Sequence, residues 1–190
     1  MKILYKFLFI FLFSTTVAQA NVESWYTYWS VGASNHTYPG ELNDIFNDAE
    51  SLPGVDRTEI AIDMLGFYWP VSNKTILGFV VSGSGDYLSD GVNDVSIKQY
   101  LYALSAMHYF GNEPGNGMFL RGDLGASRIV VESNLSNESV SDDGSGYLIG
   151  AGYGFSVSTK SRLILGINYS SNSIDNETFT STLFTVGGLW

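Results

Sequence analysis

Residues 178–190 read TFTSTLFTVGGLW, and their side chains change character from one residue to the next. Successive side chains of a β-strand point to opposite faces, so Phe184, Val186 and Trp190 fall on one face of an extended chain. A tilted strand needs about 9–11 residues to cross a membrane. This stretch therefore predicts a strand long enough to span a bilayer, ending on an aromatic residue.

Seven further stretches have the same extended character, and no helical period of useful length competes with them. The eight predicted strands are 24–37, 57–70, 75–88, 96–110, 118–131, 146–157, 162–171 and 178–190. Short connectors alternate with the longer polar connectors 39–56, 89–95, 132–145 and 172–177. Short turns at one end and long loops at the other are typical of an outer-membrane barrel.

Alternation within the strands predicts the two faces of the barrel wall. In 146–157, bulky residues such as Tyr147 and Ile149 alternate with glycine and serine. The same parity places Ile60, Ile62, Met64 and Tyr68 of 57–70 outside, together with Leu120, Leu124, Ala126, Leu163 and Leu165. It places five charged residues inside the lumen: Glu59, Asp63, Arg121, Asp123 and Arg162. Bulky residues outside and small or charged residues inside indicate a wall that faces lipid.

The first twenty residues have the features of an export signal: Lys2 and Lys6, the apolar run 7–13, and the small-residue site Ala18-Gln19-Ala20. We therefore expect residues 1–20 to be a signal peptide and residues 21–190 to form one barrel domain. The remaining chain has seven basic and nineteen acidic side chains, a net charge of −12. Such a surface repels nucleic acid, so we expect no nucleic-acid partner.

Fourteen of the nineteen acids fall in or beside the four long connectors, which contain no lysine or arginine. They are Glu41, Asp44, Asp48, Glu50, Asp56, Asp86, Asp90, Asp94, Glu132, Glu138, Asp142, Asp143, Asp175 and Glu177. In a barrel these loops meet at one end, so the sequence predicts one strongly acidic rim. Calcium prefers oxygen ligands, but Asp142-Asp143-Gly144 lacks the other ligand positions of an EF-hand, and we expect no metal site.

The leader, the eight alternating strands and the terminal Phe184, Val186 and Trp190 pattern resemble the small eight-stranded outer-membrane barrels of Gram-negative bacteria, the OmpA/OmpX type. The resemblance covers essentially all of residues 21–190 and implies an all-β, eight-stranded, antiparallel, up-and-down transmembrane barrel in the bacterial outer membrane. It also implies that Phe184, Val186 and Trp190 form the signal read by the barrel-assembly machinery. The ending departs from the family pattern in its final Trp190 and in Gly188.

An eight-stranded barrel has an interior just wide enough to be filled by side chains. We therefore expect the five lumen charges to form a structural network in which Arg121 and Arg162 neutralise the carboxylates. A gated ion path is the functional alternative. Arg128 shares the outward parity of Leu124 and is expected to contact lipopolysaccharide phosphate at the outer interface.

Catalysis would need a nucleophile and a base, and the chain has two histidines and no cysteine. His36, next to Ser34 and Asn35, is the one plausible candidate. Its surroundings do not reproduce the deacylase motif of some small outer-membrane barrels, so we expect His36 to be a polar residue at the membrane interface, with no catalytic residue and no cofactor. His108 is expected in an aromatic belt, with Trp25, Tyr26, Trp29, Trp69, Tyr109 and Trp190 as interfacial anchors.

Leu42, Ile45, Phe46 and Ala49 follow helical spacing in the first long loop and predict a short amphipathic helix over the barrel mouth. It would serve as a packed lid or as a partner-binding element. The sequence thus favours a non-enzymatic, monomeric outer-membrane barrel, structural or surface-interacting, with lipid and lipopolysaccharide as partners. The alternatives are a lipid A-modifying enzyme, a narrow passive pore and a soluble carrier; a carrier would place its bulky residues inside.

Overall fold

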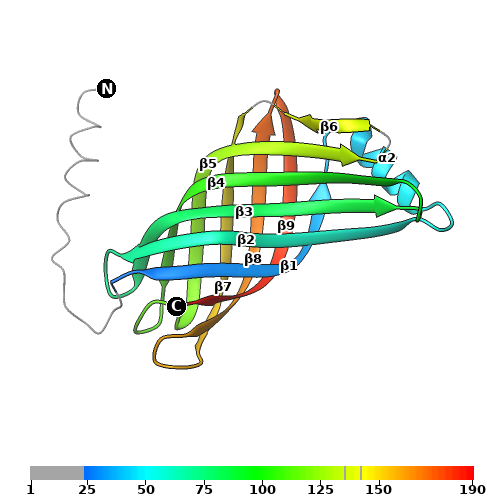
Figure 1. The fold of residues 1–190 in the computed structure, drawn as a ribbon. Helices are drawn as coiled ribbons and strands as arrows, with labels where there is room; N and C mark the ends of the chain where they lie inside the picture. The colour runs from blue at the N-terminus through cyan, green and yellow to red at the C-terminus, as the bar shows by residue number, and fades with distance from the viewer. Residues whose placement is uncertain (1–23, 135, 142) are drawn as a thin grey trace, which may run out of the picture.

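The computed structural model describes residues 24–134, 136–141 and 143–190, and of residues 136–138 it describes the backbone alone. Eight antiparallel strands close into a barrel (Figure 1). They are β1 (Tyr26–Thr37), β2 (Asp56–Pro70), β3 (Thr75–Ser89), β4 (Asp94–Tyr109), β5 (Gly117–Ser133), β7 (Gly144–Ser156), β8 (Arg162–Ile174) and β9 (Glu177–Leu189). Each strand pairs with the next, and β1 pairs with β9 to close the cylinder. The predicted fold class is confirmed, and the predicted leader lies outside the described residues.

Two elements lie at the end of the barrel opposite Trp190 and the start of β1: helix α2 (Glu41–Glu50) and the short strand β6 (Ser136–Val140). This end, which also carries the β3–β4 and β8–β9 turns, is called the loop end below. The opposite end, with the short connectors around residues 71–74, 110–116 and 157–161, is the turn end. Among the described residues, α2 is too short and too polar to cross a membrane, and no other helix could do so.

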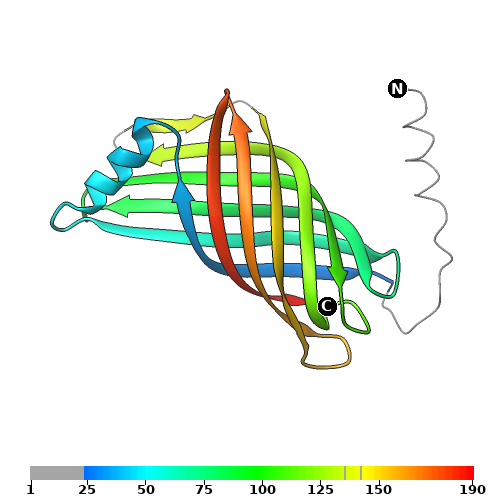
Figure 2. The same ribbon diagram turned by 180° about the vertical axis from the view of Figure 1, so that it is seen from behind.

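The wall at the loop end is uneven. Beyond Ser127, β5 no longer pairs with β7 and pairs with β6 instead. On the other side, β2 pairs with β1 only as far as Ile60, which leaves residues 56–59 beyond that seam. The outer ends of β2, β3, β4 and β5, with β6, therefore form a sheet that continues past the closed cylinder, and α2 lies against its concave side (Figures 1 and 2). We call this part the sheet extension.

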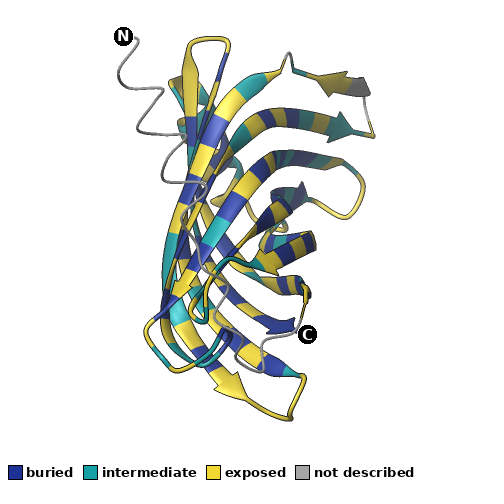
Figure 3. Cartoon of the chain, turned by 90° about the vertical axis from the view of Figure 1, so that its left-hand side faces the viewer, coloured by how far each residue is buried: buried dark blue, intermediate teal, exposed yellow. Residues whose placement is uncertain are grey.

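Burial alternates along the strands as the sequence predicts (Figure 3). On β7, Tyr147, Ile149, Tyr153 and Phe155 are exposed, whereas Leu148 is buried. Leu120 and Leu124 of β5 are exposed, while Arg121 and Asp123 between them are each 4% exposed. The bulky side chains thus form an apolar outer wall, and the charged ones are inside. This is the polarity of a membrane barrel and the reverse of a soluble carrier.

The predicted parity of β2 is wrong beyond Met64, because a β-bulge interrupts the strand. Asp63 pairs with Ser82 and Leu65 with Val81, so Met64 is an extra residue without a partner of its own. An extra residue shifts every later side chain to the other face. Tyr68, expected outside, is therefore completely buried in the lumen, and Phe67 and Trp69 point outward.

The exposed aromatic residues form two bands. Trp25, Trp29, Trp69 and Trp190 are exposed at the turn end, where Trp29 stacks on Trp190 with 5.7 Å between ring centroids. Towards the loop end the exposed aromatics are tyrosines, among them Tyr102, Tyr147 and Tyr169. Two such bands mark the two membrane interfaces. Tyr26 and Tyr109 were expected to be interfacial anchors, and this prediction was wrong. Both are buried in the lumen, because Tyr26 shares the inward parity of Tyr28 and Tyr109 that of Met107.

Candidate functional site

The lumen is filled with side chains, in layers from one end to the other. At the turn end an apolar cluster includes Tyr28, Tyr68, Met107, Tyr109 and Leu189. A second cluster around Val80, Leu101 and Leu148 lies nearer the middle. A third lies beneath α2 at the loop end. Polar and charged groups occupy the spaces between these clusters, and they decide what the lumen can do.

The central charged group consists of Asp63, Arg121 and Asp123. Arg121 donates to both oxygens of Asp63, at 2.8 and 2.9 Å, and to Asp123, at 2.7 Å from Nη2 to Oδ2. Ser30 donates to Asp63, and Ser105 donates to Asp123. The Arg121 guanidinium also lies 5.4 Å from the centre of the Tyr28 ring. Every charged group here is buried and bonded, which is the condition for a stable buried ion network.

A second charged group occupies the mouth at the loop end, and its centre is Arg57, which the sequence reasoning missed. Arg57 donates to both oxygens of Asp86, at 2.9 and 2.7 Å, and lies 3.3 Å from Glu59 and 3.0 Å from Glu50 of α2. Asp86, counted above as a loop acid at a strand edge, lies within β3 and is fully buried. The lumen-facing position of Arg57 could have been predicted from the sequence, because Arg57 shares the inward parity of Glu59.

The five predicted lumen charges are therefore not one network. Asp63, Arg121 and Asp123 lie together, and Glu59 belongs to the mouth group. Arg162 lies at the turn end, where it donates to Glu113 at 2.8 Å and to the Ser158 carbonyl at 2.8 Å. Arg162 is thus paired with a carboxylate of the β4–β5 connector and helps to fill the turn end of the barrel.

His36 points into the lumen and is 5% exposed, so its expected interfacial position was wrong. Ser34 donates to the Ile60 carbonyl, and its Oγ lies 2.9 Å from His36 Nε2. Gln99 and Ser181 lie 3.1 and 2.9 Å from His36 Nδ1. This set of contacts is satisfied by a neutral imidazole that donates from Nε2 and accepts at Nδ1. His36 and Ser34 thus form a polar layer between the two charged groups.

Helix α2 covers the mouth. Phe46 is 4% exposed and packs with Tyr38, Leu88, Ile97 and other apolar residues beneath the helix. Tyr38 donates to Asp86 at 2.8 Å. Burial, with the neighbouring Asp86 carboxylate, raises the pKa of Tyr38 well above its usual value, so the phenol remains a donor. Other parts of the helix surface are open, and Ile45 is 58% exposed.

On the outer wall, the three residues of the terminal pattern point away from the lumen. Phe184, Val186 and Trp190 are exposed, and the Trp190 backbone exchanges two hydrogen bonds with Thr27 of β1.

At the loop end, Arg128 is exposed and donates to Asp143, at 2.9 Å from Nε. His108 is exposed near the turn end, with its ring 5.2 Å from that of Phe110. Within the described ranges no three histidine or acidic side chains are grouped to hold a metal ion.

No family model matches the chain, and no curated protein matches its sequence. Solved structures do match. Neisserial surface protein A (NspA) is 13% identical, with a TM-score of 0.66 over 90% of this chain and 98% of its own. Ail, the attachment invasion locus protein of Yersinia pestis, in complex with the heparin analogue sucrose octasulfate, is 14% identical, with a TM-score of 0.53 over 88% of this chain and 100% of its own.

At these identities the likeness shows the fold. The fold, together with the apolar outer wall and its two aromatic bands, is that of a small eight-stranded β-barrel of the bacterial outer membrane.

Proposed function

We propose that this protein is a non-enzymatic, monomeric barrel of the outer membrane that acts at the cell surface. Its loop end faces outward, with α2 and the acidic loops available to partners, and its turn end faces the periplasm. Short periplasmic turns and longer external loops are the usual arrangement of such barrels, which supports this orientation.

The observation that carries the proposal is the filled lumen. The Arg121 group lies in the middle, with an apolar cluster on its turn-end side and α2 over the mouth. An eight-stranded barrel leaves no spare width for a water-filled channel around such side chains. A protein without an open path acts through its surface, not through transport.

Planar-bilayer recording of the purified barrel tests the closed lumen. We expect no steady conductance steps. Steps of nanosiemens size, retained in an Arg121→Lys variant and enlarged when α2 is deleted, would support the passive pore instead.

The placement of Ser34 and His36 supports a non-enzymatic role. Both face the lumen under α2, whereas a lipid substrate would approach from the hydrocarbon side of the wall. Mass spectrometry of lipid A from cells expressing the native protein and a His36→Ala variant should give identical species. A change that depends on His36 would establish the lipid A-modifying alternative.

The charges of the loop end indicate the chemistry of its partners. Its three cations in the described part of the chain are each engaged by carboxylates: Arg57 by Asp86, Lys98 by Glu132 and Arg128 by Asp143. An acidic rim with neutralised cations repels polyanions at low salt. Sucrose octasulfate, the ligand in the Ail complex, should therefore not bind this protein in a calorimetric titration.

The absence of cysteine allows a direct test of orientation. Val92, 77% exposed in the β3–β4 turn, and Asn73, in a turn at the other end, can each be changed to cysteine. On intact cells, a membrane-impermeant maleimide should label the Val92→Cys protein and leave the Asn73→Cys protein unlabelled until the outer membrane is opened. The reverse pattern would invert the proposed orientation.

A further inference from the structure

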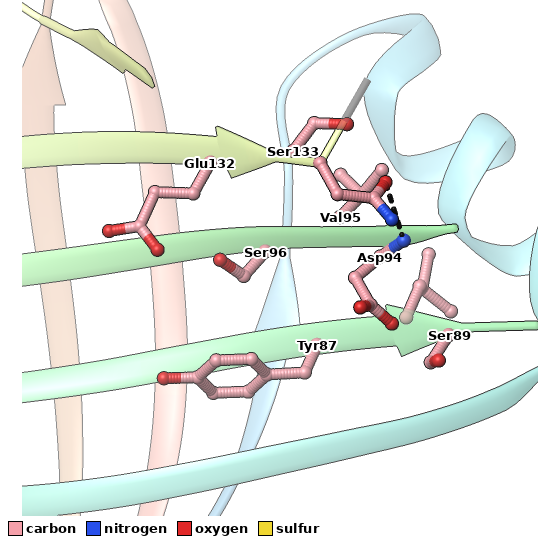
Figure 4. Close-up of a pocket in the computed structure, with 9 residues that line it drawn as sticks. Tyr87, Ser89, Asp94, Val95, Ser96, Glu132 and Ser133 are labelled. Carbon is pink, nitrogen blue, oxygen red and sulfur yellow. Dashed lines mark hydrogen bonds between the residues drawn. The ribbon is translucent and has the colours of Figure 1, made fainter. Parts of the chain in front are cut away.

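A hollow of about 460 Å³ lies on the sheet extension at the loop end (Figure 4). Its polar lining comes from β3, β4 and β5 and the residue after β5, and it includes Tyr87, Ser89, Asp94, Ser96, Glu132 and Asn134. The register places Tyr87 opposite Ser96 and Ser96 opposite Glu132, in one row across the three strands. Because Asp86 points inward to Arg57, its neighbour Tyr87 points outward, and the hollow faces away from the lumen. Its volume lies within the roughly 300–1,000 Å³ of small-molecule sites.

Tyr87 forms an aromatic wall of this hollow. A Cβ atom built on Gly85 would lie 2.7 Å from Tyr87 Cε2 and 3.1 Å from Cζ and the hydroxyl oxygen. The outer end of the ring, with its hydroxyl group, therefore lies along the strand over Gly85. Tyr87 remains partly exposed, so part of its ring is accessible to a ligand. Glycine at position 85 is what makes room for this ring.

The polar side of the hollow is held in place. Asn134 accepts from the Asp94 backbone N–H at 3.1 Å and donates to the Val92 carbonyl at 2.7 Å, which joins the β3–β4 turn to the end of β5. Lys98 lies 2.5 Å from Glu132 and neutralises it. Asp94 is exposed beside them, and Figure 4 shows its carboxylate directed from β4 towards the end of β3, where Ser89 lies. One neutralised carboxylate, a second carboxylate with no ion pair among the described residues, and serine hydroxyls thus lie around an aromatic ring.

We propose that this hollow binds a neutral sugar ring. A pyranose has a face of C–H groups that packs on an aromatic ring, and hydroxyl groups at its edge that donate to carboxylates. Tyr87 would take the C–H face, and Asp94 and Glu132 would accept from the hydroxyls. The Asp94 carboxylate opposes a phosphate or sulfate.

The position of the hollow supports this ligand class and rests on the orientation in the proposed function. Along β4 the outward residues change from Leu104 through Tyr102 and Tyr100 to Lys98 and Ser96. Ser96 lies four residues beyond Tyr100, which at about 3.3 Å per residue and the usual tilt is roughly 10 Å outside the tyrosine band. At this height above the membrane interface, the hollow would meet surface saccharide and not lipid phosphate.

Calorimetric titration of the full-length protein in detergent micelles tests the proposal. The probes are core oligosaccharide released from lipopolysaccharide by mild acid, and a set of free neutral di- and trisaccharides. We expect saturable binding that is about tenfold weaker in Tyr87→Ala, about tenfold weaker in Asp94→Asn, and within about threefold of native in Tyr87→Phe. Tyr169→Ala, an exposed tyrosine on the outer wall of β8, is the matched control and should bind as the native protein does.

Binding of the core oligosaccharide alone would assign the sugar to neighbouring lipopolysaccharide, and equal binding of the free saccharides would assign it to other glycans; either result supports the site. No saccharide binding, binding unchanged by Tyr87→Ala, or tighter binding of a trilysine peptide would overturn it. A shift in gel mobility on boiling shows that each variant is folded. The labelling and conductance experiments do not depend on this hollow, so their failure is distinguishable from its failure.

Discussion

Arg121 of β5 and Asp63 of β2 form two parallel hydrogen bonds inside the barrel, at 2.8 Å from Nη1 to Oδ2 and 2.9 Å from Nη2 to Oδ1. The same guanidinium bonds Asp123, so one cation serves two buried carboxylates. The group therefore responds unequally to the loss of its members. Loss of the cation leaves two like charges, whereas loss of one carboxylate charge leaves a balanced pair.

Arg121→Met should lower the free energy of unfolding by about 3–5 kcal/mol, because it leaves the buried carboxylates uncompensated. Asp123→Asn should lower the free energy of unfolding by clearly less, because Arg121 and Asp63 remain paired. Urea unfolding in lipid vesicles, followed by tryptophan fluorescence, measures both. Lys74→Met, in an exposed turn, is the control and should stay within about 0.5 kcal/mol of the native protein. Equal stability of Arg121→Met and the control would contradict the structural role of the group.

Asp86→Asn should loosen helix α2, because it weakens the bonds of both Arg57 and Tyr38 to a fully buried carboxylate. Limited proteolysis of the reconstituted protein should cut residues 39–55 several times faster in this variant. Glu50→Gln removes a partly exposed ion pair worth at most about 1 kcal/mol and should change the cutting rate little. If both variants were cut at the native rate, the apolar cluster under Phe46 alone would hold the helix.

Tyr38→Phe should lower the free energy of unfolding by about 1–3 kcal/mol at neutral pH, because it removes a donor to a buried charge. The raised pKa of Tyr38 adds a pH dependence. The contribution of Tyr38 to the free energy of unfolding is fully present below about pH 10, the pKa of tyrosine in the unfolded chain. It is lost as the pH rises towards the higher pKa of Tyr38 in the folded protein. The stability gap between native and variant should therefore be constant up to about pH 10 and narrow above it. A gap that widened there would show that Tyr38 ionises more easily in the folded state.

Gly32→Ala should prevent closure of the barrel. A Cβ atom at this position of β1 would lie within van der Waals overlap of the Phe184 carbonyl on β9, at the seam where the first and last strands meet. Gly122→Ala is the matched control, since a Cβ atom there meets nothing within 4 Å. The gel-mobility shift on boiling should be absent or reduced for Gly32→Ala and normal for Gly122→Ala. Normal shifts in both would show that the seam relaxes easily.

The barrel could be predicted from the sequence because its wall repeats every two residues, a period that short-range physics imposes. The predicted strands agree with the structure to within three residues at each end. Tyr68 was placed wrongly because one extra residue at Met64 shifts the face of the rest of β2, and a bulge of this kind leaves no local signal. β6 was missed because its pairing depends on the free edge of β5.

The charged groups were predictable in position but not in partnership. Strand parity gives the face of Arg162 and Glu59, whereas their height along the barrel depends on strand register and tilt. That height separates Glu59 in the mouth from Asp63 in the middle, and places Arg162 beside Glu113. Asp86 was counted with the loop acids although it lies within the predicted strand 75–88, because its partner Arg57 on the neighbouring strand was not recognised.

The sheet extension gives this cylinder two unlike sides when it is viewed along its axis from the loop end. A large molecule that approaches over β2–β5 meets the sheet extension. One that approaches over β7–β9 meets shorter strands and can reach the exposed Ile45 of α2. In a crowded membrane, neighbouring proteins packed against β7–β9 would block the approach of large molecules to α2 without contacting the helix. Access to this surface would then depend on how the protein is rotated among its neighbours, as well as on how many copies the cell makes.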